Sequence, residues 1–81
     1  MPTRKEIGTE NLVGQRVVAL RKKKGMNQKA LLARLQTRGI DLGQSGLSEL
    51  EGQHRKVSDR ELLALSECLD VSVCELLRQE K

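Results

Sequence analysis

The 81-residue chain contains no tryptophan, tyrosine or phenylalanine. Its core must therefore be built from aliphatic side chains. It also lacks the aromatic platforms on which bases stack when proteins bind single-stranded nucleic acid, which argues against an RNA-binding or single-strand-binding module. The length is enough for one small domain and too short for a second hydrophobic core.

Cysteine and histidine are scarce as well. The two cysteines, Cys68 and Cys74, match no zinc-binding or redox spacing, and we expect both to be reduced and buried. His54 is the only histidine, and no hydroxyl or carboxylate near it in the sequence indicates a catalytic triad. The sequence therefore predicts no enzyme, no metal site and no cofactor.

Long apolar runs are absent too. None follows the basic residues of the N-terminus, and no segment approaches the roughly 18 uninterrupted apolar residues of a membrane span. We therefore expect a cytoplasmic protein with no membrane partner. Fifteen Lys and Arg against eleven Asp and Glu give a net charge of +4, which is compatible with an anionic partner without requiring one.

The chain has helix signals and no strand signals, because no stretch alternates apolar and polar residues between turn residues. We expect one all-α domain over residues 9–81, preceded by a flexible arm of residues 1–8. A first helix is predicted from about Glu10 to Lys24, with Thr9 as its cap and Gly25 as its left-handed stop.

Local signals also delimit the later helices. Asn27 caps a second helix, which Gly39 ends. The segments Ser58 to Glu61 and Ser72 to Glu75 have the pattern of capping boxes and introduce a fourth and a fifth helix. The polar stretch between the third and fourth helices should be an exposed connection.

The third helix, predicted from Gly43 to Glu51, has only two large apolar residues, Leu47 and Leu50. At about 100° per residue these leucines lie side by side. The rest of the helix surface is an unbroken polar arc formed by Gln44, Ser45, Ser48 and Glu49. Taken alone, this polar arc is most simply a solvated helix face.

The order of these elements resembles the Cro and phage-repressor family of helix-turn-helix domains, also called XRE-like. The resemblance rests on VGQRVVALRKKKGMNQKALLARL, GLSELEG and RKVSDRELLALSECLDVSVCELL, which cover nearly everything after Glu10. It implies a compact five-helix, lambda-repressor-like DNA-binding domain whose third helix lies in the major groove. The stretch between the second and third helices, with Gly39 to Leu42, is similar to a longer variant of the family.

The resemblance implies that the polar arc contacts base edges through Gln44, Ser45, Ser48 and Glu49. Gln44 is suited to adenine N6 and N7, and Glu49 to cytosine N4, although a carboxylate there repels phosphates unless a donor satisfies it. Contacts to the DNA backbone are implied for Asn27, Gln28, Lys29, His54, Arg55 and Lys56. Without the resemblance, these six residues are an ordinary helix start and a solvated basic loop.

Two structural features are also expected. The resemblance pairs Arg21 with Glu51, so that an ion pair ties the first helix to the end of the third. Leu32 stands where the family usually has a small alanine, and Gly46 lacks a side chain. We expect Gly46 to make room for Leu32.

Two function classes remain open. The first is a sequence-specific transcriptional regulator, expected to be a repressor, that binds a two-fold symmetric duplex operator as a homodimer. Val57 and Leu77 are candidates for its dimer interface. The alternative is a protein-interaction module of the same fold, antitoxin-like or an assembly domain, with weak or no DNA binding and an unidentified protein partner. Glu49 and the modest charge favour this alternative, whereas Gln28, Gln44 and the basic loop favour the regulator.

Overall fold

The computed structural model describes residues 11–78 of the chain. Within this range the protein is entirely helical and contains no strand, so the predicted all-α class is confirmed. The five helices are α1 (Gly14–Lys23), α2 (Gln28–Gln36), α3 (Gly43–Glu51), α4 (Asp59–Leu69) and α5 (Val73–Leu77). The expected arm of residues 1–8 lies outside the described residues.

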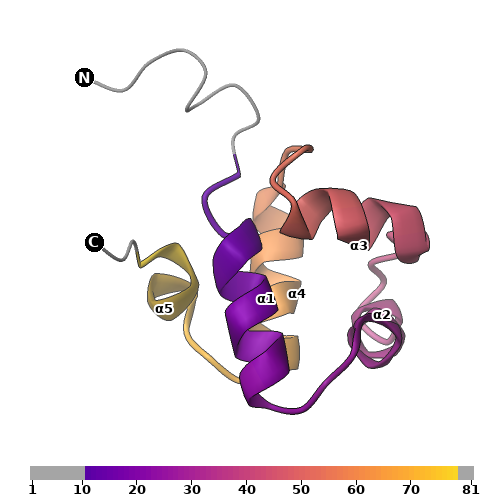
Figure 1. Ribbon diagram of the computed structural model, residues 1–81, viewed down its shortest axis with the longest axis horizontal. Coiled ribbons are helices and arrows are strands. Elements are labelled where there is room, and N and C mark those ends of the chain that lie inside the picture. The colour runs from indigo at the N-terminus through magenta and orange to yellow at the C-terminus, as the bar shows by residue number, and fades with distance from the viewer. Residues whose placement is uncertain (1–10, 79–81) are drawn as a thin grey trace.

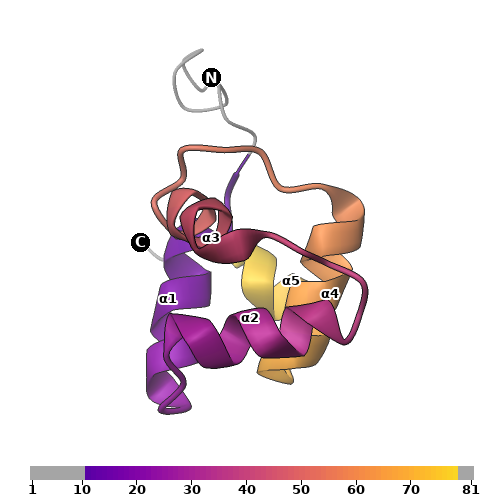
Figure 2. The same cartoon turned by 90° about the vertical axis from the view of Figure 1, so that its right-hand side faces the viewer.

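The helices α1 and α4 lie next to each other at the centre, with α5 on one side and α2 and α3 on the other (Figure 1). Seen from the side of α2 and α3, α3 lies above α2 (Figure 2). All five helices enclose one aliphatic core, and its largest fully buried side chains are Leu31, Leu35, Leu47, Leu50, Leu65, Leu69 and Leu76. Burial of each such leucine stabilises the folded state by about 1.5–3 kcal/mol, so the core is formed without aromatic residues.

Helix α1 begins at Gly14, so its predicted start at Glu10 is wrong. The backbone N–H groups of Val13 and Gly14 donate to the side-chain oxygen of Asn11, at 3.1 and 2.9 Å, and this contact holds residues 11–13 outside the helix. Thr9, the expected cap, lies outside the described residues. The predicted stop is confirmed, since Gly25 has a φ of +69°.

The sequence signals around α2 and α4 are also confirmed. The side chain of Asn27 accepts a hydrogen bond from Ala30 N at 2.8 Å and caps α2. At α4, Ser58 Oγ accepts from Glu61 N at 3.2 Å, while Glu61 Oε1 accepts from Ser58 N at 3.0 Å. This reciprocal capping box fixes where α4 begins.

The second predicted capping box forms only in part. Ser72 Oγ accepts from Glu75 N at 3.0 Å and caps α5. The return contact is absent from the cap, because the carboxylate of Glu75 instead pairs with Arg16 of α1 and with Arg78. The side chain of Glu75 therefore ties α5 to α1 rather than closing its own helix start.

Two expectations about single side chains are wrong. Cys68 is buried, and burial raises the pKa of its thiol, but Cys74 is exposed because it lies on the opposite side of α5 from the buried Leu76. A Cβ added at Gly46 would have one neighbour within 4 Å, the Cβ of Leu42 at 3.3 Å, and no atom of Leu32. The expected fit between Leu32 and Gly46 is therefore not formed.

None of the described helices is long and apolar enough to cross a membrane.

Candidate functional site

The polar arc of α3 faces outward. Leu47 and Leu50 are fully buried beneath it. The four residues of the arc are all exposed: Gln44, Ser45, Ser48 and Glu49. The helix therefore presents one continuous polar surface, and its position relative to the core is set by its two leucines.

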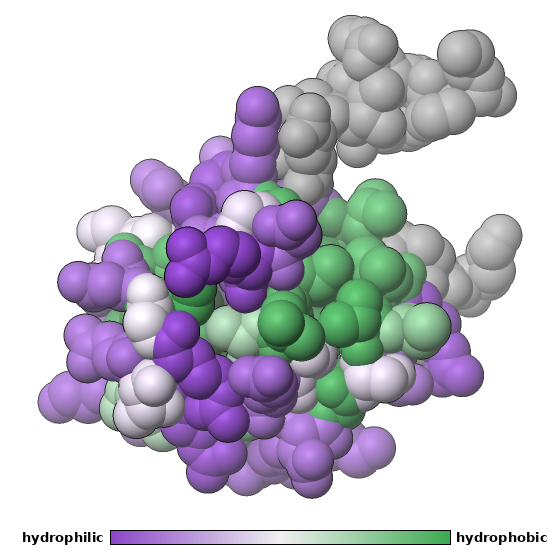
Figure 3. All heavy atoms as spheres, turned by 180° about the vertical axis from the view of Figure 1, so that it is seen from behind, coloured by the Kyte–Doolittle hydropathy of each residue, from purple (hydrophilic) through white to green (hydrophobic). Residues whose placement is uncertain are grey.

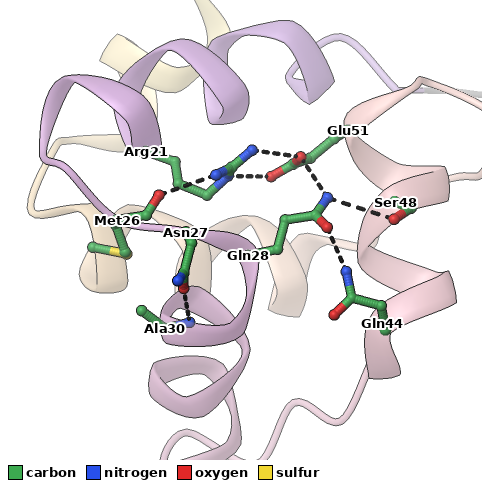
Figure 4. A network of polar contacts seen from close by, with 8 residues as sticks. All are labelled: Arg21, Met26, Asn27, Gln28, Ala30, Gln44, Ser48 and Glu51. Carbon is green, nitrogen blue, oxygen red and sulfur yellow. Dashed lines mark hydrogen bonds and ion pairs between the residues drawn. The ribbon is translucent and has the colours of Figure 1, made fainter.

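A buried ion pair holds the C-terminal end of α3. Arg21 Nε and Nη2 donate to the two carboxylate oxygens of Glu51, at 2.7 and 3.1 Å, and Nη1 donates to Met26 O at 3.0 Å (Figure 4). The two side chains are only 10% and 7% exposed. The structure thus contains the ion pair that the resemblance implied, in the two-bond geometry that gives arginine and carboxylate their strongest contact.

Gln28, at the first position of α2, extends this network to α3. Its side-chain Nε2 donates to Glu51 Oε1 at 2.9 Å and lies 3.5 Å from Ser48 Oγ. Its Oε1 accepts a hydrogen bond from Gln44 Nε2 (Figure 4). The amide of Gln28 is therefore engaged within the protein, where it joins α2 to α3.

The contact with Gln28 also orients Gln44. One N–H of the Gln44 amide is used in this contact, which leaves its second N–H and its Oε1 free of that bond. An adenine edge needs one donor and one acceptor in this arrangement. Gln44 is thus held in place while it keeps the two groups that base recognition requires.

The side chains of the basic loop after α3 differ in exposure and in pairing. His54 and Lys56 are exposed. The guanidinium of Arg55 pairs with Glu61 at 3.2 Å, with side-chain exposures of 30% and 15%. Asn27 and Lys29 are exposed at the start of α2, although the Asn27 side chain is occupied as the cap. Lys56 and Lys29 therefore offer freer positive charges to a phosphate than Arg55 does.

Sequence reasoning missed two residues that position α3. Asn11 is 5% exposed, and its Nδ2 donates to Leu50 O at 2.9 Å and to Arg55 O at 3.0 Å. A Cβ on Gly14 would lie 2.5 Å from Leu50 O and 3.0 Å from Glu51 O, so α1 and α3 meet backbone to backbone there. The predicted helix start at Glu10 placed Asn11 and Gly14 inside the helix, so neither contact was expected. The available signal was Asn11 itself, because asparagine side chains often bind backbone N–H groups near a helix start, as Asn11 does with Val13 N and Gly14 N.

Comparisons of the chain with protein-family models, with curated proteins and with solved structures found no match. No relative therefore assigns the chain to a family. Within residues 11–78, no group of three or more His, Cys, Asp or Glu side chains is placed to hold a metal ion. The chemistry that the polar arc of α3 offers is hydrogen bonding by the amide of Gln44, the hydroxyls of Ser45 and Ser48, and the carboxylate of Glu49.

Proposed function

We propose that the protein is a sequence-specific regulator of transcription, a repressor that binds duplex DNA with α3 in the major groove and acts in the cytoplasm. The observation that carries this proposal is the supported polar arc of α3. Its amide at Gln44 is held by Gln28, which is itself held by the buried pair of Arg21 and Glu51. A helix face that only meets water needs no such support, whereas base recognition requires side chains fixed in place.

The direct contacts follow from the chemistry of the arc. Gln44 pairs with the N6 and N7 of adenine, and Glu49 accepts from the N4 of cytosine. Ser45 and Ser48 have hydroxyl groups that donate or accept at a base edge or a phosphate. The exposed carboxylate of Glu49 is also the observation that favours the alternative, a protein-interaction module, because it would repel the DNA backbone if no base donor met it.

Selection from a random duplex library tests the function. The regulator predicts one recurring sequence, arranged as two half-sites about 10 base pairs apart, centre to centre. A library that yields no enriched sequence, together with binding that no duplex saturates, would leave the protein-interaction module as the function.

A two-fold symmetric site requires a homodimer. The proposed contact between the two copies is an apolar area beside α5 and the start of α1 (Figure 3). Leu12 and Leu77 are 54% and 39% exposed there. They border a hollow of about 110 Å³ with Val13, Val57 and Leu62, and an exposed leucine beside an apolar hollow is the kind of surface that a second copy can match. Sedimentation of the complex on the selected site should show two chains per duplex, and a 1:1 complex would contradict the dimer.

The salt dependence of DNA affinity shows which basic residues contact phosphates. Each lost phosphate contact flattens the slope of log K against log salt concentration by about one. Lys56→Ala should show this full change, whereas Arg55→Ala should show clearly less, because the charge of Arg55 is already paired with Glu61. Lys23→Ala, at the exposed end of α1, is the matched control and should leave the slope unchanged. Equal salt slopes for Lys56→Ala and the wild type would show that the loop is an ordinary solvated connection.

A further inference from the structure

The loop of residues 52–57, between α3 and α4, has a conformation that its own sequence does not favour. Gln53 has a φ of +63°, the left-handed region that residues with a Cβ rarely adopt. Its side-chain Nε2 donates to Asn11 O at 3.2 Å. Gly52, His54 and Lys56 are exposed, whereas Val57 at the end of the loop is half-buried against the core. Local backbone bonds hold the start of the loop, since Gln53 N donates to Leu50 O at 3.1 Å and His54 N donates to Glu49 O at 2.8 Å. The middle of the loop, from Gln53 to Arg55, is additionally held by hydrogen bonds with Asn11.

The side chain of Asn11 contacts the end of α3 and the loop at the same time. Its Nδ2 donates one hydrogen bond to Leu50 O in the last turn of α3 and one to Arg55 O within the loop, at 2.9 and 3.0 Å. The two carbonyl groups stand on either side of the chain reversal that follows α3. One buried amide thus joins the last turn of α3 to the part of the loop that carries the basic residues.

The oxygen of the same amide faces α1. It accepts from Val13 N and Gly14 N at 3.1 and 2.9 Å, so the amide uses both its donors and both acceptor positions. This arrangement also fixes the orientation of the amide, because only its NH₂ group can face two carbonyl oxygens. Asn11 therefore joins the start of α1 to the loop through contacts that an aspartate cannot reproduce.

We propose that Asn11 is a positioning residue for DNA binding, which holds the loop of residues 52–57 so that His54 and Lys56 meet phosphates while α3 lies in the groove. This inference rests on the proposed function. A loop that is ordered before binding does not lose conformational freedom on binding, so releasing it weakens the phosphate contacts without changing which bases α3 reads.

The variant Asn11→Asp removes both contacts of the amide nitrogen, with Leu50 O of α3 and with Arg55 O of the loop. The aspartate is nearly the same size and still accepts from Val13 N and Gly14 N, where a negative charge suits a helix start. Its second oxygen faces Leu50 O and Arg55 O and cannot donate to either. We expect affinity to fall about tenfold on every duplex, with the same preferred bases and a salt slope flatter by about one.

Two further variants distinguish positioning from loss of stability. In Asn11→Asp, adding Lys56→Ala should flatten the slope no further, because the contact that Lys56 makes is already lost. Leu35→Val removes volume from the core at the far end of α2, so it should destabilise the fold and leave the slope of the folded protein unchanged. All slopes are measured where urea titration shows each variant to be folded.

Gln53→Gly provides the second variant if Asn11→Asp does not fold. It removes the other contact between the loop and Asn11 while relieving the left-handed strain, and it should also flatten the slope. The positioning role would be overturned if Asn11→Asp and Gln53→Gly both had the salt slope of the wild type. If Asn11→Asp does not fold, a wild-type salt slope in Gln53→Gly alone would overturn it. Either result would leave the proposed function intact. A wild-type protein that binds no duplex would overturn both.

Discussion

Glu51→Ala should lower the free energy of unfolding by about 4 kcal/mol, since removing one partner of a buried ion pair leaves the other charge without compensation. The remaining partner, Arg21, would keep one neutral acceptor, Met26 O. Gln28 would lose its contact with the carboxylate as well. Urea denaturation at neutral pH measures the change.

A double-mutant cycle isolates the pair itself. Arg21→Ala, Glu51→Ala and the combined variant should give a coupling energy well above the 0–1 kcal/mol of surface pairs. The matched control is Arg38 with Glu67, a pair at 3.0 Å whose side chains are 37% and 51% exposed. If the two cycles give equal coupling energies, the ion pair of Arg21 and Glu51 does not hold α3.

Gly14→Ala should cost about 3 kcal/mol of stability, at the upper end of what overpacking a core usually costs. The added Cβ would lie 2.5 Å from Leu50 O, 2.8 Å from Gln53 Cγ and 3.0 Å from Glu51 O. Two of these atoms are backbone atoms at the end of α3, so relief requires α1 and α3 to move apart. The free energy of unfolding in urea is again the measurement.

Gly46→Ala is the matched control for this effect. Gly46 also lies within a helix, but its added Cβ would meet only the Cβ of Leu42, at 3.3 Å. Alanine gains about 1 kcal/mol over glycine in a helix, which offsets this tight contact, so we expect a change below about 1 kcal/mol in either direction. Similar losses for Gly14→Ala and Gly46→Ala would show that the close approach of α1 and α3 is not tightly packed.

Much of the fold could be predicted because its signals are local. Asn27 and Ser58 cap helices through atoms within three residues, and Gly25 ends α1 through its own backbone. The spacing of Leu47 and Leu50 likewise determined which face of α3 is buried, and hence which residues form the polar arc. Each of these inferences needs only the geometry of one helix or one turn.

The contacts that support the site could not be predicted in the same way, because they join residues far apart in the sequence. Asn11 meets the carbonyl groups of Leu50 and Arg55 only after α1 and α3 have packed. The partner of Arg55, Glu61, had a complete local role as half of a capping box, and nothing in the sequence indicates its second contact. The Arg21 and Glu51 pair was reached through the family resemblance and not through spacing.

The most direct measurement of the central claim, that α3 reads bases, is quantitative binding of the wild type, Glu49→Gln and Glu49→Lys to duplexes that differ at single positions. We expect the wild type to prefer one base pair per half-site by roughly 1–3 kcal/mol through Glu49, and Glu49→Gln to relax that preference while leaving the others unchanged. Equal affinity of the wild type for all duplexes, with uniform tightening in Glu49→Lys, would contradict base reading by α3.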